Sequence, residues 1–109
     1  MSGLERLPIE PGRVVISTAG RDEGRALIVL KITGDGYALA ADGCTRKVAK
    51  PKRKKFRHLS AKPERIEGIR EKVQKNAALL DAEIRAALAL AGYNRTVQLG
   101  KERCEIGEK

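Results

Sequence analysis

The sequence has few aromatic residues and no long run of apolar residues. Its aromatic residues are Tyr37, Phe56 and Tyr93, with no tryptophan, which argues against a surface that grips nucleic-acid bases mainly by stacking. No apolar stretch approaches the roughly 20 residues that a membrane-spanning helix needs. Residues 1–10 also lack the apolar centre of a signal peptide. We therefore expect a soluble, cytoplasmic protein with no membrane partner.

The chain is also poor in the side chains that build metal centres and nucleophilic enzyme sites. Cys44 and Cys104 are 60 residues apart, and together with the lone His58 they match no zinc spacing. Because no secretory signal is present, reduced thiols are favoured over a disulfide. For His58, packing at a strand end is favoured over acid–base catalysis, since no partner group is visible. We expect no enzyme, no metal, no cofactor and no small-molecule substrate.

Acidic residues are absent from residues 43–63, which carry the whole excess charge of the protein. Nine cations fall in this window: Arg46, Lys47, Lys50, Lys52, Arg53, Lys54, Lys55, Arg57 and Lys62. Outside it, 14 basic residues match 14 acidic ones, so the net charge of +9 comes from this stretch alone. Concentrated positive charge attracts polyanions, and nucleic acid is the favoured partner. An acidic protein or membrane surface, or a solvated face without a partner, are the alternatives.

The length of 109 residues fits one domain, and its first half predicts five short strands. β-Branched residues and glycine turns place the first three at residues 13–18, 26–33 and 37–42. Residues 46–50 should form a fourth strand, and residues 56–59 a short fifth. No helical pattern falls between these strands. A mainly β fold is therefore predicted, in the form of a small closed or partly open barrel.

After Ser60 the hydrophobic period becomes helical. The apolar residues that recur at steps of three, four or seven are Ile66, Ile69, Val73, Leu80, Ile84 and Leu88. One helix over residues 64–91 is possible. A break between Asn76 and Leu80 is favoured, because Asn76 is a weak helix former and Asp81 is a good N-cap. Gly92 suits the helix end.

Residues 12–29 (GRVVISTAGRDEGRALIV) resemble a KOW motif, in which a glycine-containing loop joins two strands of an SH3-like barrel. A closer resemblance is to the fourteen-e family of large-subunit ribosomal proteins and its bacterial KOW-domain relatives. It is carried by residues 19–24 (AGRDEG), 42–43 with 46–47, 51–55 (PKRKK), 58–59, and 81–85 (DAEIR), which look like the start of that family's C-terminal helix. The resemblance covers about residues 12–90. It implies an SH3-like (KOW) barrel with one or two C-terminal helices, and a translation function in binding structured, ribosomal RNA.

This resemblance and the patterns above give a domain organisation. Residues 1–8 are an N-terminal extension, residues 9–60 are the barrel with a basic segment at 46–57, residues 61–92 are a C-terminal helical segment, and residues 93–109 are a mobile tail. The expected partner is RNA, either ribosomal RNA or the ribosome, and the protein is expected to be monomeric off the ribosome.

Two basic elements are expected to contact the RNA. Gly20 and Gly24 permit a sharp turn that exposes backbone N–H groups, and Arg21 and Arg25 beside them suit bidentate phosphate contacts. Residues 52–55 form a run of cations that can follow a phosphate backbone. The expected RNA contacts are Arg13, Gly20, Arg21, Gly24, Arg25, Arg46, Lys47, Lys50, Lys52, Arg53, Lys54, Lys55, Arg57 and His58.

Other interpretations of these elements are open. The glycines could serve only a turn, and the basic segment could be a loop that binds nothing in particular. An SH3-like protein-interaction module is a further alternative, because fold alone does not fix function. The low aromatic content disfavours a groove for proline-rich ligands. A non-specific nucleic-acid binder, including one for duplex DNA, is the third alternative.

Overall fold

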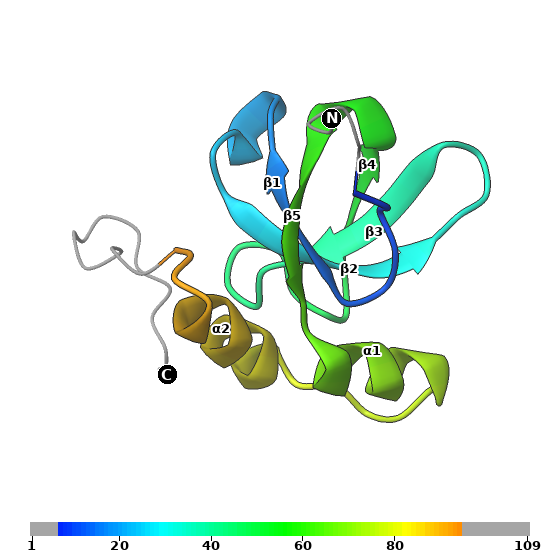
Figure 1. Ribbon diagram of the computed structural model, residues 1–109, viewed down its shortest axis with the longest axis vertical. Helices are drawn as coiled ribbons and strands as arrows, with labels where there is room; N and C mark the ends of the chain where they lie inside the picture. The colour runs from blue at the N-terminus through cyan, green and yellow to red at the C-terminus, as the bar shows by residue number, and fades with distance from the viewer. Residues whose placement is uncertain (1–6, 95–109) are drawn as a thin grey trace.

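In the computed structural model, which describes residues 7–94, five strands form one antiparallel sheet that curls into a small barrel (Figure 1). The strands are β1 (Arg13–Ser17), β2 (Ala26–Ile32), β3 (Tyr37–Ala41), β4 (Lys52–Lys55) and β5 (Leu59–Arg65), in the order β4-β3-β2-β1-β5. Two short 3-10 turns, η2 (Gly20–Asp22) and η3 (Phe56–His58), and two helices, α1 (Glu67–Gln74) and α2 (Asp81–Leu90), complete the fold. The predicted mainly β, SH3-like barrel with C-terminal helices is confirmed.

The fourth strand does not lie where the sequence predicts it. Residues 46–50 form turns rather than a strand, and β4 begins two residues later, at Lys52. The reason is local, because the carboxylate of Asp42 accepts hydrogen bonds from the backbone N–H groups of Cys44 and Arg46, both at 2.8 Å. The backbone N–H of Gly43 also donates to the carbonyl oxygen of Arg46 at 3.0 Å. These bonds fold residues 42–46 back on themselves and leave them unavailable to a ladder.

The last strand also differs from the prediction. Residues 56–58 form the η3 turn, and β5 starts at Leu59 and continues to Arg65. It pairs with β1 from Ser17↔Leu59 to Arg13↔Arg65. The strand therefore crosses the boundary that we placed after residue 60, and the first helix starts at Glu67 rather than at residue 64.

The sheet is buried on both of its faces, which the second strand shows most clearly. Leu27 and Val29 pack inside the barrel with residues of β1, β3 and β5. The residues between them along the strand, Ala26, Ile28 and Leu30, pack on the opposite face with residues of α1 and α2. All five are buried. The sequence of a strand that is covered on both sides is a continuous run of apolar residues, without the alternation of apolar and polar residues found in a half-exposed strand.

The two helices are separate, as the favoured prediction states. α1 ends at Gln74, and Asn76 adopts a left-handed φ of 60° in the connection. The N-cap position of α2 is Leu80 rather than the expected Asp81. The carboxylate of Asp81 instead accepts a hydrogen bond from the backbone N–H of Val48 at 2.7 Å. It thereby joins the helix to the loop that follows β3.

This loop approaches α2 so closely that only glycine fits at one position. Gly43 has a φ of +77°, and a Cβ there would lie 2.4 Å from the backbone oxygen of Asp81. The guanidinium of Arg85 donates to the carbonyl oxygen of Gly43 at 2.6 Å. The loop and the N-terminal part of α2 are therefore packed as one unit.

The first residues of the predicted tail are attached to the domain. The Tyr93 hydroxyl donates to Glu64 Oε1 at 2.6 Å, and burial together with this neighbouring carboxylate raises the pKa of Tyr93 to about 12. The side-chain amide of Asn94 bonds both the N–H and the carbonyl oxygen of Ala26, at 3.1 and 2.9 Å. Asn94 thus satisfies the backbone at the start of β2. The rest of the predicted tail, and most of the predicted N-terminal extension, lie outside the described residues.

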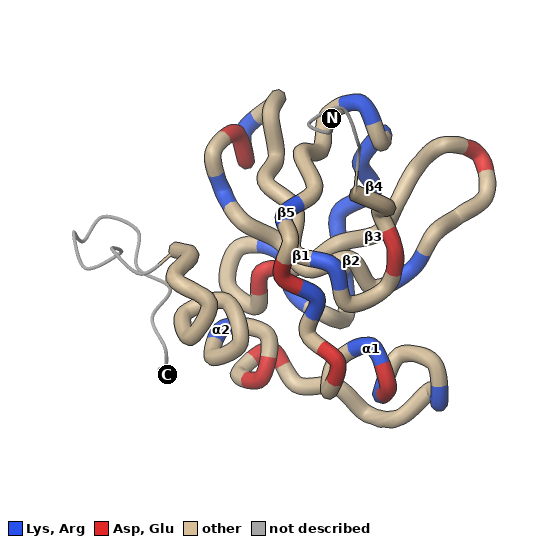
Figure 2. Tube along the Cα trace, viewed as in Figure 1, with Lys and Arg blue, Asp and Glu red and all other residues tan. Residues whose placement is uncertain are grey.

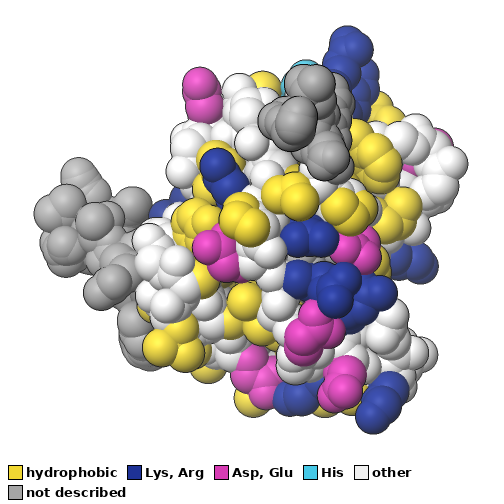
Figure 3. Space-filling view, in the orientation of Figure 1, with side chains coloured by type: hydrophobic (Ala, Val, Ile, Leu, Met, Phe, Trp, Pro, Cys, Tyr) yellow, Lys and Arg dark blue, Asp and Glu magenta, His cyan; other side chains and the backbone are white. Residues whose placement is uncertain are grey.

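Opposite charges are mixed on the face formed by the helices and the N-terminal segment. Glu10 accepts from the guanidinium groups of Arg13, Arg65 and Arg70, at 2.7, 3.4 and 3.0 Å. The Arg13 guanidinium holds the pKa of Glu10 below its usual range, with Arg70 and Arg65 adding to the effect. Figure 3 shows this mixing, with Lys and Arg beside Asp and Glu over α1. The strongest unbalanced positive charge therefore lies elsewhere.

Candidate nucleic-acid interface

The loop between β1 and β2, residues 18–25, is a compact turn with internal hydrogen bonds. Gly24 N–H donates to the Ser17 carbonyl at 2.8 Å, and Ser17 N–H donates to the Arg25 carbonyl at 3.0 Å. Gly20 and Gly24 have φ values of +81° and +88°, a region that side chains with a Cβ rarely adopt. The glycines that the sequence singles out are therefore required by the backbone. Arg21 lies on the exposed tip of this turn.

A buried carboxylate in this loop fastens it to the basic segment. Asp22 is only 6% exposed and pairs with Arg46, whose Nη2 lies 3.0 Å from Asp22 Oδ2. Lys54 Nζ lies 3.6 Å from the same oxygen. Lys54 also donates to the Ala19 carbonyl at 3.0 Å. Residues far apart in the sequence, from the loop and from β4, thus meet at one ionic cluster.

The four cations of β4 differ in their surroundings. Lys54 is 7% exposed and faces the loop, whereas Arg53 and Lys55 are exposed and Lys52 is half-buried. Strand geometry causes this difference, because successive side chains point to opposite faces. Figure 2 shows Lys and Arg following each other along β4 with no acidic residue between them. The strand presents three accessible cations and one buried one.

A second buried carboxylate organises the loop before β4. Asp42 Oδ2 accepts from Arg25 Nε at 2.8 Å in addition to the backbone bonds described above. Burial alone would raise the pKa of Asp42, but the N–H groups of Arg46 and Cys44 and the Arg25 guanidinium outweigh it, and the pKa is lowered. The Arg25 side chain is consequently held against the barrel. Lys47 and Lys50 lie exposed on the same loop.

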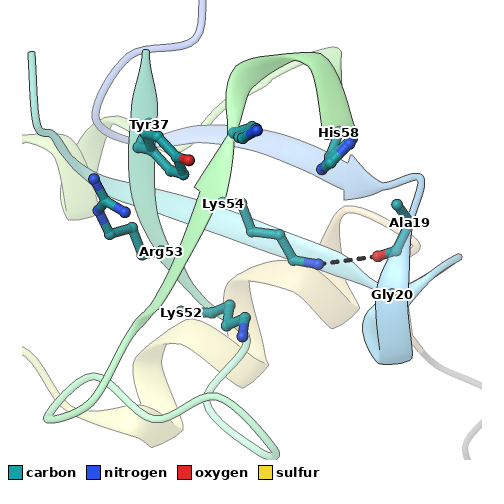
Figure 4. Close-up of a pocket in the computed structure, with 8 residues that line it drawn as sticks. Ala19, Gly20, Tyr37, Lys52, Arg53, Lys54 and His58 are labelled. Atoms are coloured by element: carbon teal, nitrogen blue, oxygen red, sulfur yellow. Dashed lines mark hydrogen bonds between the residues drawn. The ribbon is translucent and has the colours of Figure 1, made fainter. Parts of the chain in front are cut away.

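The loop and β4 enclose an open pocket of about 290 Å³. It is lined by Ala19, Gly20, Tyr37, Lys52, Arg53, Lys54, Lys55 and His58. Figure 4 shows the Lys54 side chain extending across the pocket to Ala19, with His58 and Lys52 on opposite sides of the Lys54 side chain. The two basic elements that the sequence predicts separately therefore form one surface.

At the edge of the same pocket, the aromatic ring of Tyr37 and the guanidinium of Arg53 are stacked. Arg53 Cζ lies 3.7 Å from the centroid of the Tyr37 ring, and Lys55 Nζ lies 5.9 Å from it. Arg53 Nη2 also bonds Asp35 Oδ2 at 2.6 Å. The hydroxyl of Thr33 and the Arg53 guanidinium hold the pKa of Asp35 below its usual range. Arg53 is thus fixed in place by both a ring and a carboxylate.

No protein-family model matches the sequence. One relative is the large ribosomal subunit protein eL14 of Hyperthermus butylicus, which is 31% identical over 84 residues, spanning 77% of this chain and 79% of that protein. The chain belongs to the eL14 family. The predicted resemblance to the fourteen-e ribosomal proteins is confirmed.

In this member of the eL14 family, the predicted contact residues other than Gly20 and Gly24 fall into two groups. Those without a side-chain hydrogen bond or ion pair to another described residue are Arg21, Lys47, Lys50, Lys52, Lys55, Arg57 and His58. Those whose charge is paired within the domain are Arg13, Arg25, Arg46, Arg53 and Lys54. Sequence alone gives no means of separating these groups.

Arg13 lies away from the interface. Its side chain is buried, and its guanidinium donates to Glu10 and to the carbonyl oxygens of Pro8, Lys62 and Pro63. It joins the N-terminal segment to β5, and we do not retain it among the proposed RNA contacts. A buried guanidinium with this many partners is structural.

The residues that sequence reasoning missed are Tyr37 and the carboxylates that hold the cations: Asp22, Asp35 and Asp42. Asp22 and Asp35 belong to the loop and turn motifs, but the sequence gives no sign of their partners, which are 18 or more positions away. For Tyr37, the sequence gives its place at the start of the third strand, but its position opposite Lys55 in the β3–β4 ladder is set by the fold.

The expectation of reduced thiols stays a prediction, because Cys104 lies outside the described residues. Within residues 7–94, no group of three His, Cys, Asp or Glu side chains could hold a metal ion. None of the helices in that range is long and apolar enough to cross a membrane.

Proposed function

We propose that the protein binds ribosomal RNA as a non-enzymatic component of the translation machinery. The RNA interface comprises the exposed tip of the loop at residues 18–25, the loop at residues 42–51, β4 and η3. The observation that carries the proposal is that each of the four segments presents residues without an ion pair in the described structure, and that those of β4 line the pocket beside the loop at residues 18–25, in a chain of the eL14 family. Phosphates contribute most of the affinity in such interfaces, and cations held by a folded surface fix the register.

The proposed phosphate contacts are the unpaired cations: Arg21, Lys47, Lys50, Lys52, Lys55 and Arg57. The glycine loop contributes shape, because Gly20 and Gly24 leave backbone open to a close approach. Arg25, Arg46 and Lys54 hold the two loops on the barrel through Asp42 and Asp22. The cytoplasmic location and the monomeric state off the ribosome stay predictions.

The test begins with crosslinking in cells and sequencing of the attached RNA, which should return ribosomal RNA at one reproducible site. Binding of that RNA fragment is then measured at several salt concentrations. The triple variant Lys52→Ala, Lys55→Ala, Arg57→Ala should flatten the salt slope by about 2–3, at 0.7–0.9 per lost phosphate contact.

The matched control is Lys31→Ala, Lys62→Ala, Lys75→Ala, which removes the same charge from elsewhere on the surface. It should change the slope much less. If both triple variants flatten the slope equally, only net charge matters and the proposed location is wrong. If crosslinking returns no ribosomal RNA, the proposed function is wrong.

A further inference from the structure

The stack of Arg53 on Tyr37 is organised beyond what a phosphate contact requires. The guanidinium lies over the ring at 3.7 Å and is held by Asp35 at 2.6 Å, yet the Arg53 side chain remains 50% exposed. Its charge is already balanced by Asp35, so its value as a phosphate contact is reduced. The Arg53 guanidinium instead provides a flat surface of fixed orientation. One face of this plane lies on the Tyr37 ring, and the other faces solvent.

This flat surface borders the pocket between β4 and the loop at residues 18–25. The pocket measures about 290 Å³, which is near the lower end of the roughly 300–1,000 Å³ found for small-ligand sites. Lys52, Lys55 and His58 line it. Among the described residues, the carboxylates that bond its lining are Asp22, already paired with Arg46 and Lys54, and Asp35, already paired with Arg53. The lining thus combines a stacking surface with unpaired cations within the space of one nucleotide.

We infer that this pocket receives a single unpaired nucleotide of the bound RNA. The base stacks on the open face of the Arg53 guanidinium, and the adjoining phosphate lies against Lys55, which is on the same face of β4 beside the Tyr37 ring. Unstacked bases in loops and bulges are the parts of RNA that proteins hold on aromatic and guanidinium planes. A base within a duplex has both faces covered by its neighbours and cannot reach the pocket. This inference rests on the proposed function and adds a preference for one class of RNA structure.

The test uses the full-length protein and three RNA hairpins of identical stem. One carries a single bulged 2-aminopurine, one has the same base paired with uridine, and one has an abasic residue in the bulge. The bulged base should bind roughly tenfold more tightly than either of the others, the effect expected for one stacked base. Its fluorescence should change on binding, since stacking alters the environment of the base.

The decisive variant is Arg53→Lys, which keeps the charge and removes the plane. It should lose most of the preference for the bulged base while keeping the salt slope. The matched control is Arg65→Lys, because Arg65 is also exposed and is held by a carboxylate, Glu67, at 2.6 Å. The control should keep the full preference. Thermal unfolding of both variants checks that each is folded at the binding temperature.

The outcomes separate the two proposals. Equal, salt-dependent binding of all three hairpins by the unmodified protein refutes the nucleotide pocket and leaves the phosphate interface standing. A full preference retained in Arg53→Lys refutes the role of the guanidinium plane and therefore the inference. Absence of salt-dependent binding to any hairpin refutes both.

Discussion

Replacing Lys54 by methionine tests whether the four consecutive cations of β4 have different roles. Lys54 is 7% exposed and lies between the Asp22 carboxylate, at 3.6 Å, and the Ala19 carbonyl, at 3.0 Å. Removing one partner of a buried ion pair costs about 3–5 kcal/mol, because the other charge stays buried. Arg46 still pairs with Asp22 in the variant, so we expect a loss near the lower end, about 3 kcal/mol in the free energy of unfolding.

In a domain of this size, a loss of about 3 kcal/mol lowers the melting temperature by roughly 12–24 °C. The matched substitution is Lys55→Met on the next residue, whose side chain is exposed. It should change the unfolding free energy by about 0.5 kcal/mol or less. Chemical denaturation with both variants in parallel measures the difference directly.

The effect of the two variants on RNA binding should be reversed. Lys55→Met should flatten the salt slope by about 0.7–0.9, one phosphate contact, and Lys54→Met should leave it unchanged while the protein is folded. Equal stability of the two variants would refute the burial argument. A slope lost in Lys54→Met would show that the RNA reaches this lysine and that Asp22 does not neutralise it.

Three further predictions concern the framework. Both Gly43→Ala and Gly34→Ala place a Cβ on a residue with a left-handed φ, but in Gly43→Ala that Cβ would also lie 2.4 Å from the backbone of α2. Denaturation should show a loss of unfolding free energy of about 1–2 kcal/mol for Gly34→Ala and a larger one for Gly43→Ala. Equal losses would contradict the close approach. Leu88→Ala removes a buried side chain and should cost about 2–5 kcal/mol, but Leu90→Ala, at an 88% exposed residue, should be nearly neutral. Because the pKa of Tyr93 is raised from 10 to about 12, its protonated hydroxyl stabilises the fold fully below pH 10, and this contribution is lost as the pH rises to 12. Tyr93→Phe should remove that part of the alkaline decline. An ultraviolet titration compared with that of Tyr93→Phe, in which Tyr93 ionises near pH 10, would contradict it.

The sequence predicts the barrel well where the strands are apolar, and poorly where they are not. β1 and β2 contain the β-branched residues on which the prediction depends, and β3 is an apolar segment bordered by the glycine turns at Gly36 and Gly43. β4 has the sequence KRKK, which shows no alternation, so nothing in it indicates a strand. Its conformation is set by pairing with β3 and by the burial of Lys54 against Asp22. Both are long-range interactions.

The same limit applies to the candidate site. The glycine loop and the basic segment are recognisable as separate motifs, because each is contiguous in the chain. The division of cations into paired and unpaired ones cannot be recognised in the sequence, because it depends on carboxylates from distant segments. Asp42, for example, bonds Arg25, which is 17 positions away. Composition shows how much charge the window carries, and only the fold shows how much of it is already neutralised.

The burial of both faces of the sheet has a consequence for the order in which the protein matures during synthesis. The barrel interior is built from residues up to Leu59, but the outer face of β1 and β2 is covered by Ile69, Ile84 and Leu88. Those residues leave the exit tunnel after the strands of the barrel. Until they do, the nascent barrel exposes an apolar face on β1 and β2. The barrel and the helices are therefore each incomplete without the other. We expect the chain to acquire its native surface in one late step, the packing of the helices on the barrel, rather than domain by domain.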